Sequence, residues 1–200
     1  MGDAVKGKAF IRHEFDEAIA VHKAIVEAER ILAKAHPMAD ARTAIGTMLE
    51  TDEQLLRDLR DLGKGYGATG KAEDVAAAMS DLSEKVSKSA KEAPSEAYES
   101  HAVLLAMLRK QQDSAAAVAK IATAMGDSEV KVAATEMQRT TKGEADELSK
   151  LLAVLAVDIA TEGAKNGHAK NGRAKSAAGS TSTTAKKATA KKATATAASR

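Results

Sequence analysis

The stretch AFIRHEFDEAIAVHKAIVEAERILAKAH, residues 9–36, decides the fold class of this chain. It contains neither Gly nor Pro, and its apolar residues recur at spacings of three and four, which is the period of an α-helix. At about 1.5 Å per residue, this helix would be roughly 40 Å long. Because its apolar stripe is narrow, it needs partner helices of similar length to bury it. The stripe consists of Ile11, Phe15, Ala18, Ile25 and Leu32, flanked by Ile19 and Val26.

The rest of the chain supplies four further segments with helical periodicity and no strand candidate. Pro37 and Pro94 separate helices, because proline cannot continue the hydrogen-bond ladder. Asp40 is expected to cap the second helix, and residues 1–8 are expected to be a frayed end. The sequence therefore predicts an all-α protein in which two long antiparallel hairpins are joined by a crossover with its own short helix. After 9–36, the expected helices cover 41–62, 74–92, 96–125 and 128–161.

The second helix runs into a glycine cluster, GKGYGATG at residues 63–70. Gly65, Gly67 and Gly70 match the GxGxxG pattern of dinucleotide-binding loops. That pattern has its mechanical meaning only between a strand and a helix, whereas here it follows a helix. We interpret the cluster as C-capping glycines followed by a flexible turn.

The layout of two long hairpins, a glycine-rich exit and a helical crossover resembles the ferritin-like superfamily. The nearest likeness is to bacterial stress-induced, YciF-type ferritin-like proteins, through segments such as LETDEQLLRDLRDLG at 49–63 and the Ala-Met-Gly-Asp turn at 124–127. The likeness covers about residues 10–160 and implies a ferritin-like four-helix bundle. Resemblance to DNA-protecting ferritin relatives also implies a role in stress protection or in organising the nucleoid.

The resemblance also implies a metal centre built from one Glu on each of two helices and a Glu-x-x-His motif on each of the other two. Glu50 is followed by Glu53, and Glu144 by Glu147, so the histidine is missing from both candidate motifs. The family's ferroxidase activity is therefore not expected, although a degenerate metal site is an alternative.

Polar residues on the predicted inner faces give that alternative its ligands. One interpretation is an iron or manganese site formed by His22, Glu29, Asp52 and Glu144. The other is a pair of buried polar contacts, His22 with Asp52 and Arg109 with Glu144, that set the helix register. If the crossover puts the two turns at opposite ends of the bundle, counting residues from the turns puts both pairs near its middle. Helical projection turns these polar side chains inward: His22, Glu29, His36, Asp52, Thr141 and Glu144, with Gln112 at the edge of its stripe.

Composition excludes several other functions. The chain has no cysteine, so disulfides, zinc–thiolate sites and cysteine nucleophiles are ruled out. The longest apolar run, residues 151–157, is far shorter than the roughly 20 residues of a membrane span. No catalytic triad or phosphate-binding loop was recognised. With no signal peptide visible, we expect a cytoplasmic protein without a membrane span, with association with the nucleoid as a possibility.

Charge is divided unequally along the chain. All 28 acidic residues lie in 1–162, where they face 21 Lys and Arg residues and leave a net charge of −7. Residues 163–200 carry the other nine basic residues and no acidic one. This segment contains no apolar residue larger than Ala, so we expect it to be disordered.

The repeated Ala-Lys-Lys units of this segment also resemble the tails of histone-like proteins, which predicts salt-sensitive binding of DNA phosphates. A solvating tail, a tail folded onto its own acidic body and attraction to anionic lipid are the alternatives. The residues expected to contact DNA are Lys165, Lys170, Arg173, Lys175, Lys186, Lys187, Lys191 and Lys192.

The sequence thus predicts a non-catalytic, ferritin-like stress or nucleoid-associated protein that binds DNA through its tail. Because one such tail binds weakly, assembly into a homo-oligomer would strengthen binding. A metal-binding oxidoreductase and a structural or adaptor bundle that binds another protein are the alternative functions.

Overall fold

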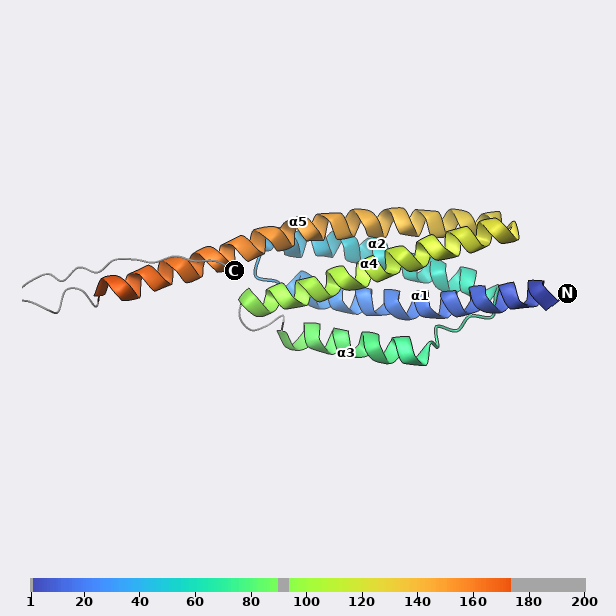
Figure 1. Cartoon of the computed structure of the whole chain (residues 1–200), viewed down its shortest axis with the longest axis horizontal. Helices are drawn as coiled ribbons and strands as arrows, with labels where there is room; N and C mark the ends of the chain where they lie inside the picture. The colour runs from blue at the N-terminus through green and yellow to red at the C-terminus, as the bar shows by residue number, and fades with distance from the viewer. Residues whose placement is uncertain (1, 90–93, 174–200) are drawn as a thin grey trace, which may run out of the picture. The chain divides into compact units, whose positions relative to one another are not determined.

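The computed structural model describes residues 2–89 and 94–173, which form five α-helices and no strand in those ranges. The chain divides into two compact units, residues 1–162 and 163–200, and the first unit holds the helical bundle. The expected all-α class is confirmed. In chain order the helices are α1 (Gly2–Ala35), α2 (Ala39–Lys64), α3 (Glu73–Ser89), α4 (Pro94–Met125) and α5 (Ser128–Arg173) (Figure 1).

The main differences from the sequence-based expectation are at the start of α1, at the end of α5 and at the N-cap of α2. α1 begins at Gly2, so residues 2–8 are helical rather than frayed, and α5 ends at Arg173 rather than at 161. Both extensions follow from helix cooperativity, because lengthening an existing helix avoids the cost of nucleation and no proline stops it. The N-cap of α2 is Met38, and Asp40 lies in the first turn, where its charge favours the helix dipole. Of the tail predicted to be disordered, 163–173 is therefore helical, and 174–200 lies outside the described residues.

The helices of the bundle alternate in direction with one long crossover. Figure 1 shows α1 and α3 running one way and α2 and α4 the other, with the bundle part of α5 running parallel to α1. α3 therefore carries the chain back along the bundle between the two hairpins. As a result, the α1–α2 turn and the α4–α5 turn lie at opposite ends, which is the condition under which the two sets of inward polar residues share one level.

The core consists of two apolar clusters along the bundle. Both are built from small and aliphatic side chains, with Phe15 as the one aromatic member among the buried residues described. Buried polar residues lie among these clusters on all five helices, and His22 lies at the level where the clusters meet on α1. The first cluster includes Ile25, Leu32, Ile45, Leu104 and Leu148, and the second includes Ile11, Phe15, Leu59, Val118 and Met137.

The glycine-rich loop after α2 is held in place rather than free. The backbone N–H groups of Thr69 and Gly70 both donate to Asp16 Oδ1 at 2.7 Å. Tyr66 stacks on Phe15 with ring centroids 5.6 Å apart. Two backbone amides of the loop therefore bind a carboxylate of its own chain.

No helix in the described part of the chain is both long and apolar enough to cross a membrane.

Candidate functional site

The candidate site is a cluster of buried ionisable side chains from α1, α2 and α5. Its first contact is between His22 and Asp52, both fully buried. His22 Nε2–H donates to the backbone carbonyl of Asp52 at 3.0 Å and lies 3.3 Å from Asp52 Oδ1. Burial lowers the pKa of His22, and the Asp52 carboxyl and carbonyl only partly oppose this. The predicted His22–Asp52 contact is confirmed, with a neutral histidine.

Glu29 adds a second carboxyl to Asp52. Burial, together with repulsion from the neighbouring Asp52, raises the pKa of Glu29 to about 11. Burial also raises the pKa of Asp52, while His22 and the neighbouring Glu29 lower it. Glu29 therefore keeps its proton at neutral pH. The oxygen atoms of both carboxyls are buried without a hydrogen-bond partner among the described residues.

Glu144 of α5 brings a third carboxyl towards the same point. Burial raises its pKa to about 9, with repulsion from Asp52 as the next cause and Glu147 after it. Its Oε2 atom is buried without a partner. Like Glu29, Glu144 is thus protonated at neutral pH as long as no positive charge reaches it.

Arg109 does not pair with Glu144, contrary to the prediction. Its side chain is exposed, and it donates to Asp146 Oδ1 at 2.8 Å and to Gln112 at 3.1 Å. The residue count from the turn placed Arg109 at nearly the right level but on the wrong side of α4. The arginine that would have repelled a cation is therefore absent from the cluster.

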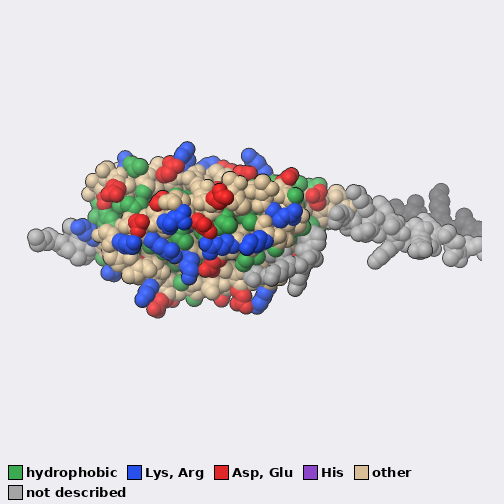
Figure 2. All heavy atoms as spheres, turned by 180° about the vertical axis from the view of Figure 1, so that it is seen from behind, with side chains coloured by type: hydrophobic (Ala, Val, Ile, Leu, Met, Phe, Trp, Pro, Cys, Tyr) green, Lys and Arg blue, Asp and Glu red, His purple; other side chains and the backbone are tan. Residues whose placement is uncertain are grey.

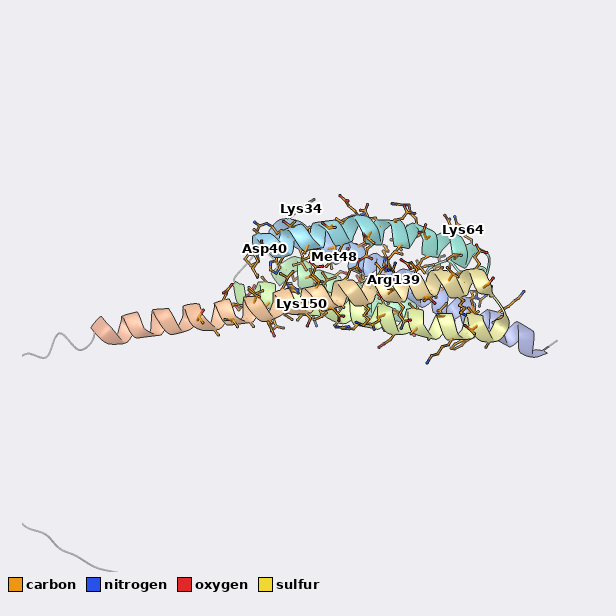
Figure 3. All side chains as sticks on the ribbon, turned by 90° about the horizontal axis from the view of Figure 1, so that it is seen from above. Lys34, Asp40, Met48, Lys64, Arg139 and Lys150 are labelled. Atoms are coloured by element: carbon orange, nitrogen blue, oxygen red, sulfur yellow. The ribbon has the colours of Figure 1, made fainter. Side chains whose placement is uncertain are left out.

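A groove between α2 and α5 connects this cluster with solvent. Its walls are rich in threonine, and Asp40, Met48 and Arg139 mark it in Figure 3. Glu144 lines the groove and is 8% exposed, whereas Glu29 and Asp52 are completely buried. Exposed Glu147 also lines the groove. Glu144 is therefore the member of the cluster that protons or ions reach first.

A separate buried contact joins two histidines near the α1–α2 turn. The backbone N–H of Met38 donates to His36 Nδ1 at 3.1 Å, and His36 Nε2–H donates to His101 Nδ1 at 3.1 Å. His101 Nε2–H in turn donates to the carbonyl of Leu148 at 2.9 Å. This chain of bonds uses every ring nitrogen with both rings neutral. Burial lowers the pKa of both histidines, that of His36 to about 4.

Sequence reasoning missed four buried polar residues of α4: Ser100, His101, Gln111 and Ser114. His101 and Gln111 are both completely buried, and Gln111 donates to the sulfur of Met137 at 3.0 Å. They lie three residues before Leu104 and three after Leu108, on the same helical stripe. That spacing was the signal that could have found them. The inward positions expected for His22, Glu29, His36, Asp52, Thr141 and Glu144 are confirmed, since all are buried.

As a metal site, this cluster has the right atoms but not the right convergence. His22 Nδ1, both carboxyl oxygens of Glu29 and of Asp52, and Glu144 Oε2 lack hydrogen-bond partners, which is unusual for buried polar atoms. Yet in the described ranges no three His, Asp or Glu side chains stand where they could share one metal ion. In this arrangement Glu29 and Glu144 are protonated at neutral pH, and the residues do not fit a preformed metal centre.

The side chains predicted to contact DNA belong to the second unit. Lys165, Lys170 and Arg173 lie in the last part of α5, where the backbone is helical. Lys175, Lys186, Lys187, Lys191 and Lys192 lie outside the described residues. Comparison with known proteins adds no further evidence, because no protein-family model, curated protein or solved structure matches this chain.

Proposed function

We propose that this protein binds DNA without sequence specificity through its basic C-terminal segment, and that the acidic bundle carries that segment. One observation supports this most directly: the compact first unit ends at Glu162, which is also the last acidic residue of the chain. The boundary in structure and the boundary in charge therefore coincide. All the net positive charge lies beyond it.

The proposed mechanism is electrostatic. Each Lys or Arg that neutralises a phosphate releases a counterion, so affinity falls as salt rises. No aromatic residue occurs in 163–200, which argues against stacking on single-stranded bases. A homo-oligomer would present several tails to one DNA molecule and raise the affinity.

The test is duplex DNA binding by the full chain with the four lysines of the Ala-Lys-Lys units changed to glutamine: Lys186, Lys187, Lys191 and Lys192. The matched control changes four exposed lysines of the first unit instead: Lys71, Lys120, Lys131 and Lys150. We expect the tail variant to lose about 3.6 from the slope of log affinity against log salt, at about 0.9 per phosphate contact, and the control to lose none. Equal slopes in the two variants would refute the proposal.

The same proposal includes a ferritin-like arrangement of the bundle. Support comes from the single long crossover through α3, because ferritin-like bundles have one such connection. Roles in stress protection or in organising the nucleoid would follow from this likeness together with DNA binding. The missing Glu-x-x-His histidines argue for a non-catalytic member.

A second candidate function, binding of a divalent cation such as iron or manganese, is favoured by the unpartnered oxygens of Glu29, Asp52 and Glu144. Their lack of convergence argues against it. Metal analysis of the purified chain, with Asp52→Asn as the comparison, tests this second candidate function. Stoichiometric metal in the wild type that is lost in the variant would establish this function, and no metal in either would remove it.

A further inference from the structure

A groove on the surface of α1 and α2 is rich in positive charge although the first unit as a whole is acidic. We call it the α1–α2 basic groove. Val26 and Leu56, both buried, form its floor. Four basic and two acidic side chains surround this floor, so the groove carries a net charge of plus two. These charged residues are Lys23, Glu27 and Arg30 of α1 and Glu53, Arg57 and Arg60 of α2.

Half of these cations are not neutralised by a carboxylate. Arg30 is paired with Glu53, with 2.7 Å between Arg30 Nη2 and Glu53 Oε1. Arg57 donates only to Gln54, a neutral amide, at 2.7 and 3.1 Å, which orients the guanidinium without cancelling its charge. No ion pair or hydrogen bond is found for the Arg60 side chain among the described residues. Two guanidinium groups one helical turn apart therefore face solvent with their charge uncompensated.

Lys23, across the groove on α1, adds a third cation that is only weakly engaged. Its ammonium lies 3.9 Å from Glu27 Oε1, near the limit for an ion pair, and its side chain is 62% exposed. A pair this exposed contributes little and exchanges readily for another anion. Lys23, Arg57 and Arg60 are thus available to an anionic partner without breaking a strong contact.

The positive charge continues along this face of the bundle. Figure 2 shows Lys and Arg side chains in a row along it, with acidic side chains beside them. Figure 3 places Lys34 and Lys64 on the side of the bundle that is turned away from α5. On α2, residues 57, 60 and 64 share one helix face over about 10 Å. Successive phosphates of one DNA strand rise by about 3.4 Å, so this row is long enough to contact several phosphates of a strand. It is longer than a single phosphate ion requires.

We propose that the α1–α2 basic groove is a second contact with the phosphate backbone of the DNA duplex that the tail binds, with Lys23, Arg57 and Arg60 as its main contacts. No aromatic side chain lines the groove, which favours backbone contact over base stacking. This inference rests on the proposed function. It adds to it that the bundle orients the DNA instead of only carrying the tail.

The experiment measures binding of a short blunt-ended DNA duplex by the full chain over a range of salt concentrations. The groove variant is Lys23→Gln, Arg57→Gln and Arg60→Gln. The matched control is Lys120→Gln, Lys131→Gln and Lys150→Gln, which removes the same charge from exposed positions outside the groove. Because all six side chains are exposed, equal thermal midpoints should show that both variants are folded.

We expect the groove variant to lose about 2 to 3 from the salt slope, at about 0.9 per phosphate contact, and the control to keep the slope of the wild type. Groove and control variants with the same slope would overturn the groove inference. In that case a loss of slope in the tail variant described above would leave the tail proposal intact. A tail variant that binds like the wild type while the groove variant does not would overturn the tail proposal instead. If the wild type does not bind the duplex, both proposals fail.

Discussion

Replacing Glu29 by glutamine tests the charge state of the buried cluster. The side chain is completely buried, and burial and the neighbouring Asp52 both raise its pKa. Its pKa is about 11 in the folded chain, against 4.5 without burial. For an acid whose pKa is raised by folding, the folded state holds the proton that the unfolded state releases. Stability is then complete below pH 4.5 and is lost progressively as the pH rises towards 11.

The size of this loss follows from the same two values. Each pKa unit corresponds to about 1.4 kcal/mol. Glu29 therefore lowers the free energy of unfolding of the wild type by about 3 kcal/mol between pH 4.5 and pH 7. Glutamine is nearly the same size and has no proton to lose. Its unpartnered amide adds a penalty of about 1 to 3 kcal/mol, but this penalty does not depend on pH. The informative quantity is therefore the change with pH in the stability difference between Glu29→Gln and the wild type.

Urea unfolding of both proteins between pH 4.5 and pH 8 measures that difference. We expect the free energy of unfolding of Glu29→Gln, relative to that of the wild type, to increase by about 1.4 kcal/mol per pH unit across this range. Glu50→Gln, at an exposed position of α2, is the control and should show no such trend. A Glu29→Gln variant that loses stability relative to the wild type as the pH rises would show that Glu29 is ionised and paired with a positive charge. That outcome would refute the protonated cluster and favour a bound cation.

The hydrogen-bonded pair of His36 and His101 should behave in the opposite sense. Because the pKa of His36 falls to about 4 on folding, its contribution to folding stability is complete above pH 6.5. That contribution is lost as the pH falls towards 4, by up to about 3 kcal/mol. The free energy of unfolding of His36→Gln, measured with urea, should fall less steeply below pH 6.5 than that of the wild type. An equal fall in the two proteins would contradict a neutral pair of histidines. Gly70→Ala should destabilise the chain by about 2 kcal/mol or more, because φ is +72° and the new Cβ would lie 2.6 Å from Ile19 Cγ2. Gly143→Ala, in a helix with open space around it, should instead stabilise by about 0.5 to 1 kcal/mol, so equal thermal shifts in the two variants would be inconsistent with this structure.

Helical periodicity was enough to predict the interior of the bundle. His22, Glu29 and Asp52 were expected to point inward because they lie on apolar stripes, and all three are buried. Distance along a helix could also be counted, so Asp52 and Glu144 were expected at one level, and Asp52 is close enough to raise the pKa of Glu144. These predictions succeed because both depend only on the period and rise of the α-helix.

Contacts that depend on how a helix is rotated about its axis could not be predicted in the same way. Arg109 pairs with exposed Asp146 and not with Glu144, because the alanine-rich sequence of α4 leaves its inward face poorly defined. His36 is hydrogen-bonded to His101, 65 residues away in the sequence, and no local sequence pattern predicts such a partner. The glycine-rich loop looked flexible for the same reason, since Asp16 lies far from it in the sequence.

The most direct test of the central claim is the salt dependence of binding by the full chain to two duplexes of unrelated sequence. If the eight proposed basic side chains of residues 163–200 each neutralise a phosphate, they should contribute about −7 to the slope of log affinity against log salt, and the three side chains of the α1–α2 basic groove about −2 to −3 more. The two duplexes should give the same affinity within error. A slope near zero, or a marked preference for one sequence, would contradict the account of a basic segment that binds the DNA backbone.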